Sequence, residues 1–455
     1  MLTIPGYQLG EVINSGINTL IYRGIREKDQ QPTIIKTLKA ESPTIEQLAR
    51  LKHEYQIAAN LEAEGIVKVY GLETCQNGLA LILEDFGGKS LREILTSLKS
   101  PLELKGFLKI AIQLAETLGF LHQNQIIHKD IKPGNIIINS QTDKVKVTDF
   151  SIASRLSKED SLIANLGKFE GTLAYMSPEQ TGRMNRSIDY HTDFYSLGVT
   201  FYEMLTGEIP CQGEDAIEIV HCHIAKQFLT PQQLNGIIPT TISEIVMKLL
   251  AKNAEDRYQS AGGLKVDLET CLNQLAEKGA IAYFSPGKLD RSSQLTIPQK
   301  LYGRDNEVNQ LLTGFERVSQ GQREIILVSG YSGIGKSSLI NEVHKPIVRQ
   351  RGYFIEGKFD QFKRNIPYAA LIQALEDLIG QLLSESPEKL AYWHKEIQAA
   401  LGESGQVIID VIPDLEKILG KQPPVAEIGA AESQNRFNRL FQQFIQVFAQ
   451  KSHPL

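Results

Sequence analysis

Residues 126–138 read IIHKDIKPGNIII, so a short polar stretch separates two β-branched apolar runs. Such runs predict strands, and the PGN between them is typical of a loop. A polar hairpin would account for the turn residues. It would not account for Asp149, which follows Asn135 by fourteen positions at the end of another β-rich run, VKVTDF. The segment therefore predicts a loop built around charged side chains.

The 455 residues are too many for one ordinary domain, and two blocks of patterned sequence are visible. Short β-rich runs alternate with one helical segment from residue 7 to about 100, which predicts a small, mostly antiparallel sheet. Residues 101–275 show helical periodicity instead. The apolar positions that carry it are Ile110, Ala111, Leu114, Leu118 and Leu121. Residues 276–300 lose periodicity and gain Pro, Gly and Ser, which predicts a linker.

The second block, residues 301–455, alternates helical and β-rich patterns. A helix is expected near 304–320, a strand at EIILVSG, a helix from Lys336 and a strand at YFIEGK. This order predicts an open α/β sheet.

A phosphate-binding loop stands between the first predicted strand and helix of this block. The segment GYSGIGKSS fits G-x-x-x-x-G-K-[ST] with Gly330, Gly335, Lys336 and Ser337. Glycines allow backbone N–H groups to surround phosphate oxygens, the lysine reaches the terminal phosphates, and the serine hydroxyl binds magnesium. ATP and Mg²⁺ are the expected ligands.

Hydrolysis at this loop would need an acidic residue at the end of a second apolar strand. No apolar run after Lys336 ends in two acidic residues, and VIIDVIP around Asp410, the nearest candidate, is followed by Pro. The chain stops at KSHPL, shortly after an amphipathic helical pattern. We therefore expect this P-loop NTPase domain to be incomplete and to bind ATP, and the sequence leaves open whether it hydrolyses ATP.

Further motifs join the 126–138 segment in a fixed order: TIIKTLK, VTDFS, GTLAYMSPE, DFYSLG and EDRYQSA. Together they resemble a eukaryotic-type Ser/Thr protein kinase across residues 7–275. The resemblance implies an α+β bilobal fold with an antiparallel-sheet N-lobe (7–86) and a helical C-lobe (87–275). With the P-loop block, the chain resembles the front of large bacterial hybrid sensor histidine kinases, where a kinase domain precedes an AAA/STAND-like ATPase.

The resemblance also implies a site. Asp130 would be the base, with Lys132 beside it, and Lys36 would hold the α- and β-phosphates in an ion pair with Glu54. Magnesium would be held by Asn135 and Asp149, and by Ser337 in the second block. The full set of implied nucleotide-binding positions is Asn14, Gly16, Ile21, Lys36, Glu84, Phe86, Asn135, Asp149, Gly330, Gly335, Lys336 and Ser337.

Local patterns add detail around these positions. In the helical segment near residues 42–60, Ser42 is expected to cap the helix, with Pro43 in its first turn. Glu54 should lie beside an apolar face formed by Ile45, Leu48, Leu51, Tyr55 and Ala58. The resemblance further implies that Glu179 pairs with Arg257, that Asp193 braces the catalytic loop, and that Thr172 marks Ser/Thr specificity.

The sequence departs from the family pattern in three places. Asn14, Gly16 and Thr19 stand where three glycines are usual, so the loop should close less tightly over phosphate. Lys129 replaces an Arg, which weakens control by loop phosphorylation, although Ser154, Ser157 and Ser161 are available. Ser151 replaces a Gly and should restrict movement of the magnesium loop.

Bulk composition excludes several classes of partner. The net charge is −5 with no basic block, so nucleic acid is not expected. No leader pattern and no apolar run of about 18 residues occurs, so no membrane association and a cytoplasmic location are expected. The four separated cysteines predict buried thiols in a reducing compartment. Those in CQGEDAIEIVHCHIA are not expected to bind metal, because adjacent helical residues diverge.

Three functional interpretations remain. The first is an active Ser/Thr kinase with protein substrates and downstream signalling partners. The second is a pseudokinase scaffold with a nucleotide-binding module, and the third is a nucleotide-switch ATPase regulated by the kinase lobe. Retention of Lys36, Asp130, Asn135 and Asp149 favours the first.

Overall fold

The computed structural model describes most of the chain. The described residues are 3–75, 78–98, 101–156, 172–181, 186–213, 216–291, 303–331, 333–341, 354–359, 368–383, 387–426 and 428–448.

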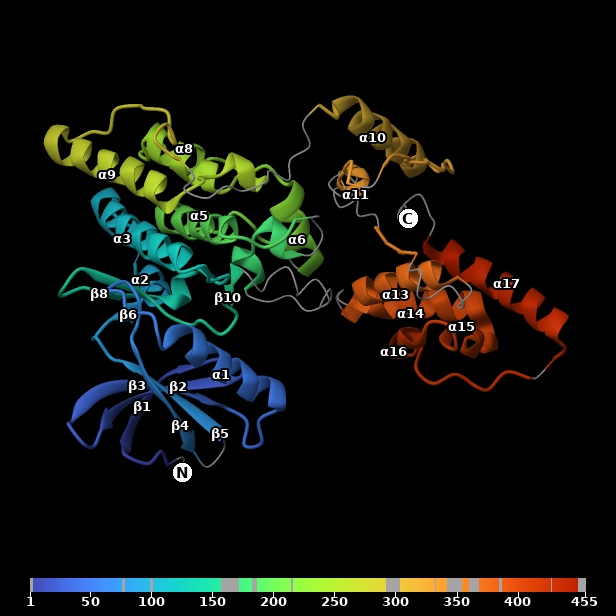
Figure 1. Cartoon of the computed structure of the whole chain (residues 1–455), viewed down its shortest axis with the longest axis horizontal. Coiled ribbons are helices and arrows are strands. Elements are labelled where there is room, and N and C mark those ends of the chain that lie inside the picture. The colour runs from blue at the N-terminus through green and yellow to red at the C-terminus, as the bar shows by residue number, and fades with distance from the viewer. Residues whose placement is uncertain are drawn as a thin grey trace.

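The N-terminal lobe is a five-stranded antiparallel sheet with one helix against it (Figure 1). The strand order is β1-β2-β3-β5-β4, so the last two strands exchange places relative to the sequence. Its elements are β1 (Tyr7–Ser15), β2 (Thr19–Arg26), β3 (Gln31–Leu38), α1 (Ile45–Ala58), β4 (Val69–Cys75) and β5 (Gly78–Glu84). The predicted antiparallel sheet with one helix is confirmed.

Helix α1 begins later than predicted. Its N-cap is Thr44, which exchanges hydrogen bonds with Gln47 in a capping box, so the expectation that Ser42 caps the helix was wrong. Of the predicted face, Leu51 and Ala58 are buried and Leu48 and Tyr55 are half-buried, but Ile45 is 88% exposed and does not belong to it. The buried side chains of α1 are those of Leu51, Glu54, Ile57 and Ala58. Glu54 thus belongs to the buried face itself.

The β1–β2 hairpin contains the three positions where glycines are usual. Asn14 pairs with Ile21 across the hairpin, and the Gly16 N–H donates to the Thr19 carbonyl at 2.9 Å. Asn14, Gly16 and Thr19 all keep negative φ angles. The β-branched Thr19 therefore fits this hairpin without a left-handed backbone, while looser closure over phosphate stays a prediction.

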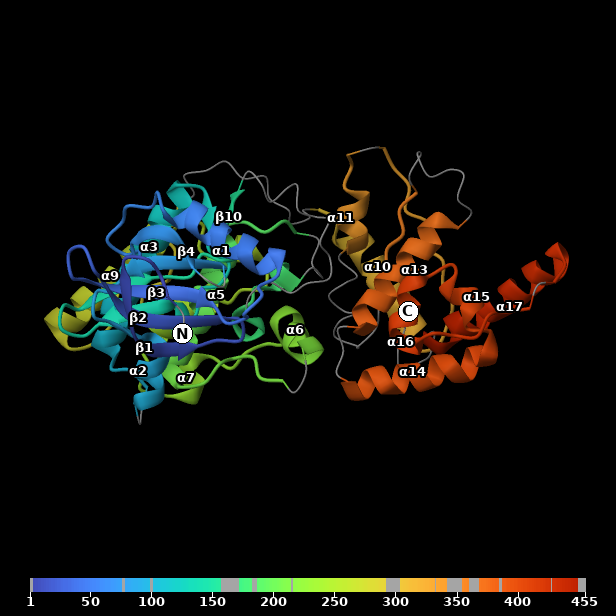
Figure 2. The same cartoon turned by 90° about the horizontal axis from the view of Figure 1, so that it is seen from below.

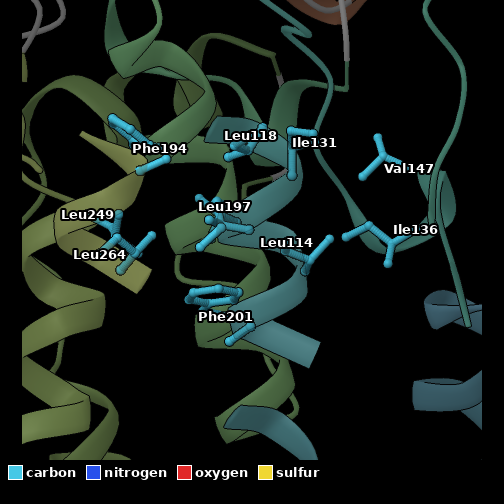
Figure 3. Packing of buried hydrophobic residues seen from close by; sticks show 14 of the residues in the cluster. Leu114, Leu118, Ile131, Ile136, Val147, Phe194, Leu197, Phe201, Leu249 and Leu264 are labelled. Carbon is cyan, nitrogen blue, oxygen red and sulfur yellow. The ribbon is translucent and has the colours of Figure 1, made fainter. Parts of the chain in front are cut away.

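The second lobe is mainly helical and holds the largest apolar core. Figure 3 shows Leu114 and Leu118 of one helix packed near Leu197 and Phe201 of another. Ala111, Leu114, Leu118 and Leu121 are buried as predicted, whereas Ile110 is only partly so. The helices are α2 (Leu91–Ser97), α3 (Leu104–Gln123), α5 (His191–Thr206), α6 (Ala216–Ala225), α7 (Pro231–Leu234), α8 (Thr240–Leu249) and α9 (Ala261–Lys278).

The short strands β6 and β8 of this lobe lie toward the N-terminal lobe (Figure 1). β6, β8 and β9 form one small sheet, and β7 pairs with β10. The elements are β6 (Lys89–Ser90), β7 (Ile126–Ile127), η1 (Pro133–Asn135), β8 (Ile136–Asn139), β9 (Lys144–Val147), β10 (Ser154–Arg155), η2 (Leu173–Tyr175), η3 (Pro178–Thr181) and η4 (Ala254–Asp256).

Residues 281–291, within the segment expected to be a linker, lie against the helical lobe. The Gly287 N–H donates to Asp267 at 2.6 Å, and Asp290 accepts from the Gln259 N–H at 2.6 Å. Phe284 packs partly buried against the main core. Packed structure therefore continues past residue 275, while the predicted domain limits remain predictions.

Two of the four cysteines are joined. Cys211 and Cys222 form a disulfide with their Cα atoms 5.7 Å apart, whereas Cys75 and Cys271 are free. The expectation of four ordinary thiols was wrong, because α6 brings Cys222 back beside the loop that precedes it. Because this disulfide is present, the wide spacing of the cysteines in the sequence no longer supports a reducing compartment.

The regular elements described in the second region are all helices or 3₁₀ turns. Figures 1 and 2 both show its later helices gathered together, and these share a separate apolar core. The elements are α10 (Asp305–Ser319), α11 (Lys336–Asn341), α13 (Ala369–Leu383), α14 (Pro387–Leu401), η6 (Gly402–Ser404), α15 (Gln406–Ile409), η7 (Pro413–Leu415), α16 (Glu416–Leu419) and α17 (Ala430–Phe448). Across the described parts of the chain, no helix is both long and apolar enough to cross a membrane.

The strands predicted at EIILVSG and YFIEGK do not pair in the described residues. Residues 322–331 and 354–359 carry no ladder, and the side chains of Ile325 and Leu327 are 97% and 90% exposed. A strand is stabilised by hydrogen-bonded neighbours, and the described part of this region supplies none beside these segments. The predicted helices near 304–320 and from Lys336 are confirmed.

Candidate functional site

A buried lysine joins two carboxylates where the two lobes meet. Lys36 Nζ lies 2.8 Å from Glu54 Oε2 and 3.0 Å from Asp149 Oδ1. Burial lowers the pKa of Lys36, but both carboxylates outweigh it, so the pKa lies above its ordinary value. Burial raises the pKa of Glu54 to about 7, with Lys36 opposing the rise. The structure thus brings together three residues that are far apart in the sequence.

Asp149 has an unusual backbone and a fixed neighbourhood. Its φ is 67°, in the left-handed region, and the ring of the next residue, Phe150, is buried against His128 with centroids 4.9 Å apart. Burial raises the Asp149 pKa, but Lys36 outweighs it and holds the pKa below its ordinary range. The Ser151 N–H lies 3.4 Å from Asp149 Oδ1, and Ser151 itself keeps a negative φ. A serine therefore fits here without strain.

Asp130 lies at the centre of a compact polar loop. Lys132 Nζ is 2.5 Å from its carboxylate and 2.6 Å from the Thr172 hydroxyl. Asn135 Nδ2 donates to the Asp130 carbonyl at 2.9 Å and to its carboxylate at 3.0 Å. The Thr172 N–H donates to the other carboxylate oxygen at 3.2 Å. Four residues of the predicted site region therefore converge.

Two buried acids, Asp193 and Glu179, belong to the scaffold around this loop, and Asp193 contacts the loop directly. Asp193 is fully buried and accepts from the N–H groups of His128 at 3.0 Å and Lys129 at 2.8 Å. Arg257 donates to both oxygens of Glu179, at 2.7 and 2.9 Å. Burial raises the Glu179 pKa, but Arg257 outweighs it and lowers the pKa. Both scaffold pairings implied by the resemblance are confirmed as contacts.

The remaining predicted nucleotide positions line the sheet near Lys36. Ile21 lies opposite Lys36 between β2 and β3, and Asn14 lies opposite Ile21. Glu84 ends β5, and its carboxylate accepts from Lys146 at 2.6 Å. The Phe86 ring lies 5.0 Å from Lys146 Nζ. Glu84 and Phe86 therefore share one basic neighbour.

The availability of serines for phosphorylation is partly corrected. Ser154 is buried in β10, so it is not accessible in this conformation. Ser157 and Ser161 lie outside the described residues.

The glycine-rich loop of the second region precedes α11 as predicted. Gly333 and Gly335 have φ angles of 79° and 92°, which favour glycine, and Lys336 Nζ donates to the carbonyls of Gly330 and Tyr331 at 2.8 and 2.9 Å. Ser337 is exposed on the first turn. Asp410, considered as an acidic partner, directly follows the helix α15, not a strand.

Two contributors were missed by sequence reasoning. His53 Nε2 donates to the Ala153 carbonyl at 2.6 Å, which ties α1 to the segment after Asp149. Gln180 Nε2 donates to the Lys129 carbonyl at 2.9 Å. Both contacts join residues at least fifty positions apart, and no local pattern marks either side chain.

Comparison with known proteins agrees with this geometry. A family model described as protein kinase domain matches residues 7–267, and one described as AAA ATPase domain matches residues 300–455. The first match covers more than half of the chain, which therefore belongs to the protein kinase family. The fold is a kinase domain with an antiparallel-sheet N-lobe and a helical C-lobe, followed by an AAA ATPase domain.

Individual relatives match this chain over different lengths. Hybrid signal transduction histidine kinase G of Dictyostelium discoideum is 35% identical in a match that covers 78% of this chain and 13% of that protein. A probable serine/threonine-protein kinase of Clostridium perfringens is 33% identical over 58% of this chain and 38% of its own. Serine/threonine-protein kinase PknB of Mycobacterium tuberculosis is 33% identical over 58% of this chain and 42% of its own. The chain thus spans less than half the length of these relatives.

Proposed function

We propose that the two kinase lobes transfer the γ-phosphoryl group of ATP to a Ser or Thr hydroxyl of a protein substrate. One observation carries the proposal: Asp130 lies within hydrogen-bonding distance of both Lys132 and the Thr172 N–H. Phosphoryl transfer requires a base that is held in place beside the substrate. Here the base lies between a cation and the segment expected to seat the substrate.

The residues present fit ATP and magnesium. The side-chain nitrogen of Asn135 donates to Asp130, so the side-chain oxygen of the same planar amide points away from Asp130. The Asp149 side chain is 30% exposed, and its Oδ1 is the oxygen that contacts Lys36. Two hard oxygen ligands suit Mg²⁺. When bound, the ion neutralises phosphate charge.

Each remaining side chain has a defined task in the proposal. Asp130 accepts or orients the proton of the substrate hydroxyl. Lys132 stabilises negative charge that develops beside it, and its contact with Thr172 holds the substrate segment in place. Lys36, oriented by Glu54, binds the α- and β-phosphates.

For the second region we propose nucleotide binding at Gly330, Gly335, Lys336 and Ser337. The support is the loop geometry, with two left-handed glycines leading into α11. A role in signal transduction, with downstream signalling partners, is proposed from the name of the Dictyostelium relative.

The test is labelling of a generic basic protein by the full chain with radiolabelled ATP and magnesium. Wild type should place phosphate on Ser or Thr, and Asp130→Asn, purified identically, should label roughly 10²- to 10⁴-fold less. Lys336→Ala should label as wild type does, since it changes only the second nucleotide site. Equal labelling by wild type and Asp130→Asn would refute the proposal in favour of a pseudokinase scaffold.

A further inference from the structure

Gln180 makes two contacts that together specify an amide side chain. Its Oε1 accepts from the Ser177 N–H at 2.9 Å, and its Nε2 donates to the Lys129 carbonyl at 2.9 Å. Both partners are backbone groups whose donor or acceptor character is fixed, so the oxygen must face Ser177 and the nitrogen must face Lys129. An ionised carboxylate of the same length could make only the first contact.

The carbonyl that Gln180 contacts belongs to an unfavourable backbone conformation. Lys129 has φ 66°, in the left-handed region that residues with a Cβ atom avoid. Its N–H donates to Asp193 at 2.8 Å, so Asp193 and Gln180 hold the residue from its two ends. The peptide that carries the Lys129 carbonyl also carries the N–H of Asp130. Rotation of that peptide would therefore displace Asp130.

Gln180 is itself held by buried neighbours. Ser177 is fully buried, and Glu179, next in the chain, is ion-paired with buried Arg257. The segment 172–181 consequently meets the Asp130 loop at two points, through Thr172 and through Gln180. The first contact reaches the carboxylate, and the second reaches the peptide that carries it.

We propose that Gln180 is a positioning residue that couples the substrate-seating segment to the orientation of Asp130. This inference rests on the proposed kinase function, but it concerns a residue that does not touch the reacting atoms. Loss of the donor to Lys129 releases the carbonyl of the left-handed peptide, whose N–H still donates to His128 Nδ1 at 3.3 Å, and misplaces the base without touching Lys36 or Glu54.

The variant Gln180→Glu removes the donor while keeping the acceptor and the side-chain length. Gln233→Glu in α7 is the matched control, because Gln233 Oε1 also accepts from a backbone N–H three residues earlier, that of Thr230, at 2.8 Å. In the full chain, Gln180→Glu should lower kcat by about tenfold, with the KM for ATP unchanged within about twofold. Gln233→Glu should match wild type.

The pH profile separates positioning from general damage. A protonated carboxyl can donate to the Lys129 carbonyl, so the kcat of Gln180→Glu, as a ratio to wild type at each pH, should recover as pH falls from 8 toward about 5. The ratio for Gln233→Glu should stay flat. A Gln180→Glu defect that does not recover at low pH, or no defect at all, would overturn the inference.

Hydrogen exchange tests the same contact without activity. Amides in residues 127–131 should exchange at least about tenfold faster in Gln180→Glu than in wild type or Gln233→Glu, while α5 and α8 keep their protection. If wild type fails to label protein, the proposed function fails, yet this exchange result still decides the role of Gln180. Unchanged exchange in residues 127–131 would refute it.

Discussion

Glu54 and Asp149 share one ammonium group, and the two carboxylates differ in their environment. The Glu54 side chain is 3% exposed and the Asp149 side chain 30%. Burial raises the pKa of Glu54 to about 7, whereas Lys36 outweighs burial at Asp149 and lowers its pKa. The two acids thus titrate in different ranges, and only Glu54 changes charge near neutral pH.

The pH dependence of phosphotransfer should report Glu54. As pH falls below about 7, Glu54 gains a proton and loses its ion pair with Lys36, so kcat/KM should fall. Glu54→Gln should lower kcat/KM at pH 8 by about tenfold and abolish this acidic limb, measured between pH 6 and 8.5. An unchanged acidic limb in the variant would assign it to another group.

The same shift has a defined effect on stability. The pKa of Glu54 in the folded state lies above its ordinary value of 4.5. Between pH 4.5 and about 7, the folded state therefore keeps a proton on Glu54 that the unfolded state has already released. The contribution of Glu54 to the free energy of unfolding therefore decreases as pH rises through that window.

At the scale of elements, a buried ion pair links the η3 turn to the segment between η4 and α9. Glu179 and Arg257 are 3% and 1% exposed, and Arg257 also donates to the carbonyl of His191 at the start of α5 at 2.9 Å. Three elements of the helical lobe consequently meet on one guanidinium group. Such a group is costly to leave unpaired in the interior.

Removing one partner of this pair should destabilise the helical lobe strongly. Arg257→Met should lower the free energy of unfolding by about 3–5 kcal/mol, since it leaves Glu179 buried and unpaired. The measurement is urea denaturation monitored on the kinase transition. Arg50→Met in α1 is the control, because the side chains of Arg50 and its partner Glu46 are 46% and 53% exposed, and a cost below about 1 kcal/mol is expected. Similar costs for the two variants would contradict the assignment.

At the scale of the whole molecule, the two regions have separate apolar cores. The main core contains buried residues from Ile57 to Cys271, and the second contains buried residues from Leu375 to Phe448. The clusters share no residue, so a substitution in one need not disturb the other. Each region carries its own glycine-containing turn and its own lysine assigned to nucleotide.

The full chain should therefore bind two nucleotides independently. Calorimetric titration with a non-hydrolysable ATP analogue and magnesium should show two sites in wild type and one in either Lys36→Met or Lys336→Ala. The affected site should weaken by about tenfold or more, because each lysine supplies a phosphate contact. Two intact sites in Lys336→Ala would exclude nucleotide binding at the second loop.

The cap of α1 shows how a local pattern can mislead. Ser42 and Thr44 both precede the helix, and either could cap it, but only Thr44 has Gln47 three residues later to complete a capping box. That signal is present in the sequence. The apolar face was predicted correctly except for Ile45, whereas the full burial of Glu54 depends on Lys36, 18 positions away in another element.

Short motifs were enough to predict the bilobal fold, the P-loop and the residues around Asp130, because phosphate and magnesium chemistry requires specific side chains at close spacing. The Cys211–Cys222 disulfide, the packing of residues 281–291 and the contacts of His53 and Gln180 could not be predicted in that way. Each depends on distant segments folding back together, and their partners carry no periodic signal. The neighbours of Asp130 in the sequence are consequently enough to recognise it as the expected base, whereas its position in space depends on contacts made only in the folded chain.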